Sequence, residues 1–128
     1  MRHIQDNLYI GDIYDAQGMG YEFDEVISLT EDEINTTTTH IPLTDDEHNS
    51  PKEFNYAVEI VIDAVRSSGD VLVHCNAGIS RSVAVCAAAH SVANDVEWGQ
   101  AYTDCKCGFN DSHRSLRTMS REYAELYR

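Results

Sequence analysis

The chain has few positive charges. Its 128 residues include 22 aspartates and glutamates but only nine lysines and arginines, and the formal net charge is −13. Only Lys52 and Lys106 are lysines. A surface this acidic repels nucleic-acid phosphates and anionic lipid headgroups, so we expect no nucleic-acid partner and no membrane partner. Acidic excess with scarce lysine is typical of proteins from salt-loving microbes, and we expect a halophilic archaeal source.

Long apolar runs are also missing. No stretch approaches the roughly 20 apolar residues that span a bilayer, and the opening residues contain no apolar stretch of signal-peptide length. The four cysteines are few for a secreted disulfide scaffold. A chain of this size can bury one core without disulfides or metals. We therefore expect a single domain over residues 1–128 that is cytoplasmic and monomeric.

Short β-prone runs alternate with helical patterns along the chain. Ser50 and Glu53 form a predicted capping box at the start of one helix, and Gly69 ends it. The expected strands cover residues 8–10, 26–29, 36–41 and 70–74, and the expected helices cover a short segment within 11–20 and residues 50–68, 83–93, 97–105 and 112–126. This order predicts an α/β fold, with a central, largely parallel sheet of four to five strands flanked by helices. In such sheets, binding sites lie at the carboxyl ends of the strands.

One segment places a cysteine and an arginine on a loop between a strand and a helix. Residues 71–82 read Val-Leu-Val-His-Cys-Asn-Ala-Gly-Ile-Ser-Arg-Ser. The apolar strand ends at Cys75, and an alanine-rich helix begins near Arg81, so backbone N–H groups should converge on one point and bind an anion. A cysteine in such a loop, beside a guanidinium, is favoured as a thiolate, and we expect Cys75 to be a nucleophile.

This His-Cys-x5-Arg-Ser segment resembles the cysteine-dependent protein tyrosine phosphatases, most closely the small dual-specificity phosphatases. Residues 7–11, 26–30 and 40–45 are similar to the family's opening strand, its next core strand and the strand and loop that carry its general acid. The resemblance covers nearly the whole chain. It implies a phosphotyrosine protein phosphatase-like fold, phosphorylated protein substrates, and catalysis without metal or cofactor.

Individual residues then acquire expected roles. Cys75 would attack phosphorus, and the planar fork of Arg81 would pair with two phosphoryl oxygens. By resemblance, Ser82 would donate its hydroxyl to the sulfur, and His74 would tune the nucleophile without transferring protons. The expected phosphate-binding residues are Asn76, Ala77, Gly78, Ile79, Ser80 and Arg81.

The general acid should be a carboxylic acid on the loop after Ile41 and Pro42. Asp45 matches the family pattern best, Asp46 is the alternative, and Glu47 is a third candidate. The composition of this stretch also fits a plain solvated turn before a helix.

Other readings stay open at this level. The loop could belong to a phosphate-binding module without turnover, or to a phosphatase acting on small molecules or RNA 5′-phosphates. The absence of lysine from the loop argues against inositide substrates. Cys105 and Cys107, one residue apart, are expected to be incidental thiols rather than metal ligands. Whether Cys86 or Cys105 can reach Cys75 cannot be decided from spacing, and residues 106–112 depart from the family pattern.

Overall fold

A five-stranded sheet forms the centre of the computed structural model, which describes residues 1–67 and 69–128. The strands lie in the order β1-β2-β5-β3-β4. They comprise β1 (Arg2–Gln5), β2 (Leu8–Gly11), β3 (Glu25–Ser28), β4 (Thr39–His40) and β5 (Val71–His74). β1 runs antiparallel to β2, and all other neighbouring strands are parallel. The predicted α/β class and largely parallel sheet are confirmed.

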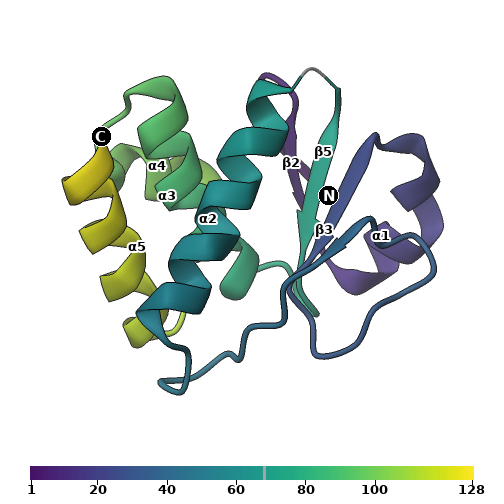
Figure 1. Cartoon of the computed structure of the whole chain (residues 1–128), viewed down its shortest axis with the longest axis horizontal. Coiled ribbons are helices and arrows are strands. Elements are labelled where there is room, and N and C mark those ends of the chain that lie inside the picture. Colours follow the sequence, from purple (N-terminus) through teal and green to yellow (C-terminus); the bar gives the residue numbers. More distant parts are fainter. Residues whose placement is uncertain (68) are drawn as a thin grey trace.

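Helices cover both faces of this sheet (Figure 1). The short helix α1 (Ile13–Met19) and the 3-10 turn η1 (Gly20–Glu22) lie on one side. The other side is covered by α2 (Pro51–Arg66), α3 (Arg81–Asn94), α4 (Trp98–Cys105) and α5 (Arg114–Tyr127). Ala16, Val26 and Leu72 form the small cluster beneath α1, and the larger core lies under the four-helix face.

The helix α3 is the most deeply buried helix. Every residue from 81 to 91 is buried, since α3 packs against α2, α4 and α5 as well as the sheet. Its partner β5 is also buried throughout and lies between β2 and β3. The loop from β5 to α3 therefore joins two elements that the core holds rigidly, at the carboxyl edge of the parallel strands.

Two features of the fold differ from the sequence expectation. The edge strand β1 was not predicted, because Ile4 is its only large apolar residue and its side chains alternate between half-buried and exposed. The expected strand at residues 36–41 reduces to the two residues of β4. Part of the threonine run instead makes side-chain contacts, with the Thr36 hydroxyl donating to Ala16 O at 3.0 Å.

Helix capping follows the expectation in part. Ser50 caps α2 by accepting a hydrogen bond from Glu53 N at 3.1 Å, and Pro51 takes the first helical position. The reciprocal capping box is found at α1, where the side chains of Asp12 and Asp15 each accept from the other's backbone N–H. Ser68, within the expected end of α2, lies outside the described residues. None of the described helices has the length and apolar character needed to cross a bilayer.

Candidate active site

The loop between β5 and α3, residues 75–81, has four of its carbonyl groups held outward by the surrounding fold. We call it the phosphate loop. Four of its carbonyls accept hydrogen bonds from outside the loop, each from a different element or junction. The pairs are His74 Nδ1 to Cys75 O (3.3 Å), Ile13 N to Asn76 O (3.0 Å), Arg2 Nη2 to Gly78 O (2.9 Å) and Ser112 Oγ to Ser80 O (2.8 Å).

The N–H groups of the same loop remain available. Within residues 1–67 and 69–128, no protein acceptor pairs with the backbone N–H groups of residues 76–80. Gly78 and Ser80 are buried and Ile79 is half-buried, and backbone donors in such positions seldom lack a partner in folded proteins. Together with the N-terminus of α3, they form a site suited to an anion.

The Cys75 sulfur lies at the base of this loop. Cys75 is only 2% exposed, and its Sγ lies 3.2 Å from Ser82 Oγ in the first turn of α3. The Ser82 hydroxyl can therefore donate to a thiolate at this position. The register of β5 turns Cys75 toward the four-helix core and His74 toward the opposite side of the sheet.

His74 is part of a buried chain of hydrogen bonds. A carbonyl can only accept, so Nδ1 carries the hydrogen in its contact with Cys75 O, and Nε2 of the neutral ring accepts. Ser28 Oγ then donates to His74 Nε2 at 2.6 Å, and Thr37 Oγ1 donates to Ser28 Oγ at 2.8 Å. Burial, aided by the nearby charge of Arg81, lowers the pKa of His74 and keeps the ring neutral.

Arg81 is buried and held by two backbone carbonyls that lie just beyond the carboxyl ends of β3 and β4. Its Nη1 donates to Leu43 O at 3.0 Å and lies 3.4 Å from Leu29 O. These contacts orient the guanidinium, and its Nε and Nη2 groups have no protein acceptor within residues 1–67 and 69–128, so they can bind a ligand in the pocket. The ladder extends beyond β3, with Leu43 N donating to Leu29 O at 3.1 Å, so the sheet itself positions both carbonyls.

The structure separates the two aspartates proposed as general acid. Asp45 lies beside the phosphate loop, where its carboxylate accepts a short hydrogen bond from Ser80 Oγ. Asp46 instead accepts from Thr44 Oγ1 at 2.7 Å and from His48 N at 2.8 Å. These hydrogen bonds lower the pKa of Asp46 to about 2. Glu47, the third candidate, is exposed and does not line the pocket.

A pocket of about 430 Å³ opens over the sulfur. Its lining residues are Asp45, Cys75, Asn76, Ala77, Ile79, Ser80, Arg81, Asp111 and His113. Gly78 lies behind the loop, where a Cβ atom would approach Gly11 O to 2.7 Å.

Asp111 and His113 were not predicted as site residues. They belong to the segment that departs from the family pattern, and His113 N reaches the pocket by donating to Ser80 Oγ at 3.0 Å. Only a tertiary contact brings this segment to the site, so local sequence carried little signal.

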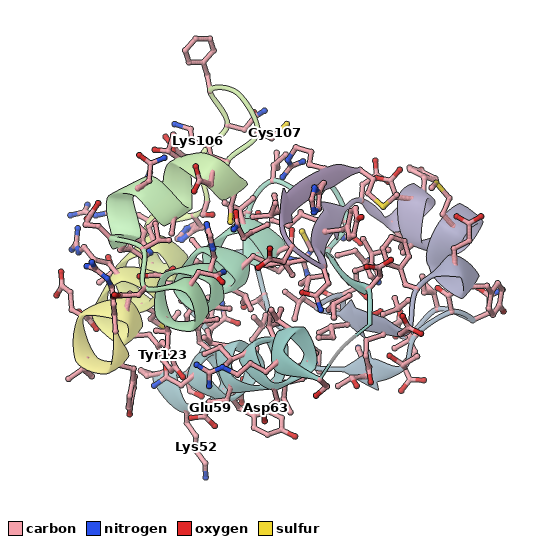
Figure 2. All side chains as sticks on the ribbon, turned by 90° about the horizontal axis from the view of Figure 1, so that it is seen from above. Lys52, Glu59, Asp63, Lys106, Cys107 and Tyr123 are labelled. Atoms are coloured by element: carbon pink, nitrogen blue, oxygen red, sulfur yellow. The ribbon has the colours of Figure 1, made fainter. Side chains whose placement is uncertain are left out.

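The remaining thiols lie apart from the pocket lining. Cys86 and Cys105 are buried, and burial raises the pKa of both, that of Cys105 to about 12. Cys107 is half-buried in the loop after α4, beside Lys106 (Figure 2). Among the described residues, only Asp46, Glu47 and His48 group as possible metal ligands, and they lie on a mostly exposed turn.

Comparison with known proteins agrees with this geometry. Residues 8–94 match the family model described as "Dual specificity phosphatase, catalytic domain". The matched segment contains the sheet from β2 onward, the phosphate loop, and the acidic loop formed by Asp45, Asp46 and Glu47. The chain therefore belongs to the dual-specificity phosphatase catalytic-domain family.

Individual relatives give the same picture. A protein of Invertebrate iridescent virus 6 designated a tyrosine phosphatase (123R) is 36% identical over 86 residues, covering 64% of this chain and 61% of the viral protein. Human DUSP28 has a similar structure (TM-score 0.81, 17% identity, 97% of this chain and 95% of that chain). The Orf virus tyrosine phosphatase OH1 is also similar (TM-score 0.75, 17% identity, 99% and 86%). At these identities, the solved structures support the fold alone.

Proposed function

We propose that this protein hydrolyses phosphotyrosine, and also phosphoserine and phosphothreonine, in protein substrates through a cysteinyl-phosphate intermediate. The observation that carries the proposal is the phosphate loop around the buried Cys75: four of its carbonyls are held outward, and the N–H groups of residues 76–80 have no acceptor among residues 1–67 and 69–128. Family membership supports the same reaction. No metal or cofactor takes part in the proposed chemistry.

In the first step, the Cys75 thiolate attacks phosphorus and the bond to the substrate oxygen breaks. Arg81 and the N–H groups of the phosphate loop hold the phosphoryl oxygens as charge spreads over them. Asp45, in its protonated form, gives its proton to the departing oxygen, so no free alkoxide or phenoxide is released. The products are the dephosphorylated side chain and phosphorylated Cys75.

In the second step, water attacks the same phosphorus and the S–P bond breaks. The Asp45 carboxylate takes a proton from the water, and the sulfur leaves as a thiolate. The Ser82 hydroxyl, 3.2 Å from the sulfur, stabilises the charge that returns to it. Inorganic phosphate is released and the starting state is restored, with Asp45 protonated again.

The proposal is tested with phosphotyrosyl, phosphoseryl and phosphothreonyl peptides, with nucleotides and inositide headgroups as competitors. We expect turnover of the peptides by the wild type, and none by Cys75→Ser, which should still bind phosphopeptide. Binding without turnover by the wild type would indicate that the protein is a phosphate-binding module and not an enzyme. A clear preference for nucleotides or RNA 5′-phosphates would indicate the small-molecule alternative.

We also propose that the protein is a monomer working in a reducing, high-salt cytoplasm of a halophilic archaeon. The support is the net charge of −13, with only two lysines, which lie on opposite sides of the molecule (Figure 2). Salt screens the repulsion among the acidic side chains and between the enzyme and an acidic phosphopeptide. Both the unfolding temperature and kcat/KM should therefore rise with KCl concentration.

A further inference from the structure

Arg2 reaches the phosphate loop from the strand that the sequence did not predict. Its Nη2 atom donates to Gly78 O at 2.9 Å and to Cys105 O at 3.1 Å. Its Nε atom is buried and has no hydrogen-bond partner in the part of the chain that the structure describes. Leaving a buried N–H donor of a half-buried arginine unpaired costs stability, so a purely stabilising role does not explain this arrangement.

The contact with Gly78 O controls the direction of one peptide group in the loop. Gly78 has φ +70°, and a glycine in this region can rotate its peptide planes with little steric resistance. If the peptide between Gly78 and Ile79 flipped, its carbonyl would turn toward the bound anion and its N–H away from it. Arg2 is the one donor to Gly78 O within residues 1–67 and 69–128.

The contact with Cys105 O connects the loop to the wall of the pocket. Cys105 is the last residue of α4, and the carbonyls at a helix C-terminus attract cations. The segment that follows α4 carries Asp111 and His113, which line the pocket. Arg2 therefore joins the back of the phosphate loop to the element that supports the pocket's outer wall.

We propose that Arg2 is a positioning residue of the phosphate loop, which holds the Gly78 carbonyl outward so that the Ile79 N–H faces the phosphoryl group. The proposal rests on the proposed function, because it assigns a role within the same site. Arg2 does not touch the substrate. It acts through one loop carbonyl, and its positive charge lies behind the loop on the side opposite the substrate.

Three substitutions separate the hydrogen bond from the charge. Arg2→Met removes both, Arg2→Gln keeps a neutral donor, and Arg2→Lys keeps the charge and a donor. Arg121→Met is the matched control, because it changes the net charge by the same amount as Arg2→Met. Arg121 is exposed on α5 and pairs with Glu125 at 3.8 Å. Each variant is assayed for kcat and KM with an aryl phosphate, for inhibition by orthovanadate, and for its free energy of unfolding.

We expect Arg2→Met to weaken orthovanadate inhibition and kcat/KM by roughly 10- to 100-fold, the effect of one charge-assisted hydrogen bond. Arg2→Lys should restore most of this loss, and Arg2→Gln should restore part of it. If Arg2 only stabilised the fold, Arg2→Met would lower the free energy of unfolding and leave the orthovanadate affinity of the folded protein unchanged.

Several results would overturn the inference. Vanadate inhibition within twofold of wild type in both Arg2→Met and Arg2→Gln would do so, as would a loss equal to that of Arg121→Met. If Arg2→Met does not fold, the comparison of Arg2→Gln with Arg2→Lys decides, since equal wild-type affinity in both contradicts the proposal. A wild type without turnover would refute the proposed function instead.

Discussion

Asp45 and Asp46, neighbours in the acidic loop, should differ in their effect on kcat when each is changed to asparagine. Asp45→Asn keeps an oxygen that can accept from Ser80 Oγ, so the loop should stay in place while the transferable proton is lost. General acid catalysis contributes about 10²- to 10⁴-fold. We therefore expect kcat with phenyl phosphate to fall by that factor, which corresponds to roughly 3–5 kcal/mol of barrier.

Asp46 does not line the pocket, and we expect it to contribute no proton to the leaving group. Hydrogen bonds from Thr44 and His48 lower the pKa of Asp46 to about 2, so its carboxyl is expected to stay ionised at pH 6. Asp46→Asn should disturb the turn that Asp46 forms with Thr44 and His48, and so lower the unfolding temperature. The dependence of kcat on the leaving group should remain as in the wild type.

A series of aryl phosphates with increasingly acidic phenols is the decisive assay. In Asp45→Asn the deficit should be largest for phenyl phosphate and should shrink for nitrophenyl phosphates, whose leaving groups need less protonation. Asp46→Asn should run parallel to wild type across the series. The assignment is refuted if the deficit that depends on the leaving group appears in Asp46→Asn and is absent from Asp45→Asn.

Three further perturbations test the rest of the site. Gly78→Ala should abolish orthovanadate binding, since its Cβ would lie 2.7 Å from Gly11 O. Gly108→Ala is the control: this glycine also has a positive φ but has open space around the Cβ, so the variant should lose only about 1–2 kcal/mol of stability and keep its affinity for orthovanadate. Equal effects of the two substitutions would contradict the close packing at Gly78. Ser82→Ala should slow hydrolysis of the phosphoenzyme roughly 10- to 100-fold and produce a burst of product in stopped-flow assays, and a loss confined to the burst phase would count against this role. Because burial lowers the pKa of His74 in the folded state, its contribution to stability is full above about pH 6.5 and is lost as the pH falls below that value. In urea titrations, the free energy of unfolding of His74→Gln should therefore decline less from pH 7 to pH 5 than that of the wild type. An equal decline in both would argue against a neutral, buried ring.

The sheet and the phosphate loop were predictable because their signals are local. A fully apolar strand, a short loop with a glycine and an alanine-rich helix follow one another in residues 71–93, and each predicts its own structure without long-range contacts. The same holds for the Ser50 cap of α2. The family resemblance added the order of these parts.

Other features depend on contacts that sequence does not encode locally. β1 carries one large apolar residue and forms only because β2 offers an open edge, so Arg2 could not be placed beside a loop 76 residues away. Asp45 and Asp46 are chemically identical in the sequence, and only the hydrogen bonds of the turn distinguish them. Leu126 has the spacing of an apolar helix face but is 76% exposed, because α5 extends past the core there.

Trapping the phosphoenzyme tests the central claim most directly. In a Cys107→Ser background, which removes the half-buried thiol, the enzyme is mixed with an aryl phosphate, quenched in denaturant within milliseconds and analysed by intact mass and peptide mapping. We predict a mass increase of one phosphoryl group located on Cys75, accumulating in Ser82→Ala and absent from Cys75→Ser. Turnover that continues in Cys75→Ser, or a phosphoryl group found on another residue, would contradict the account.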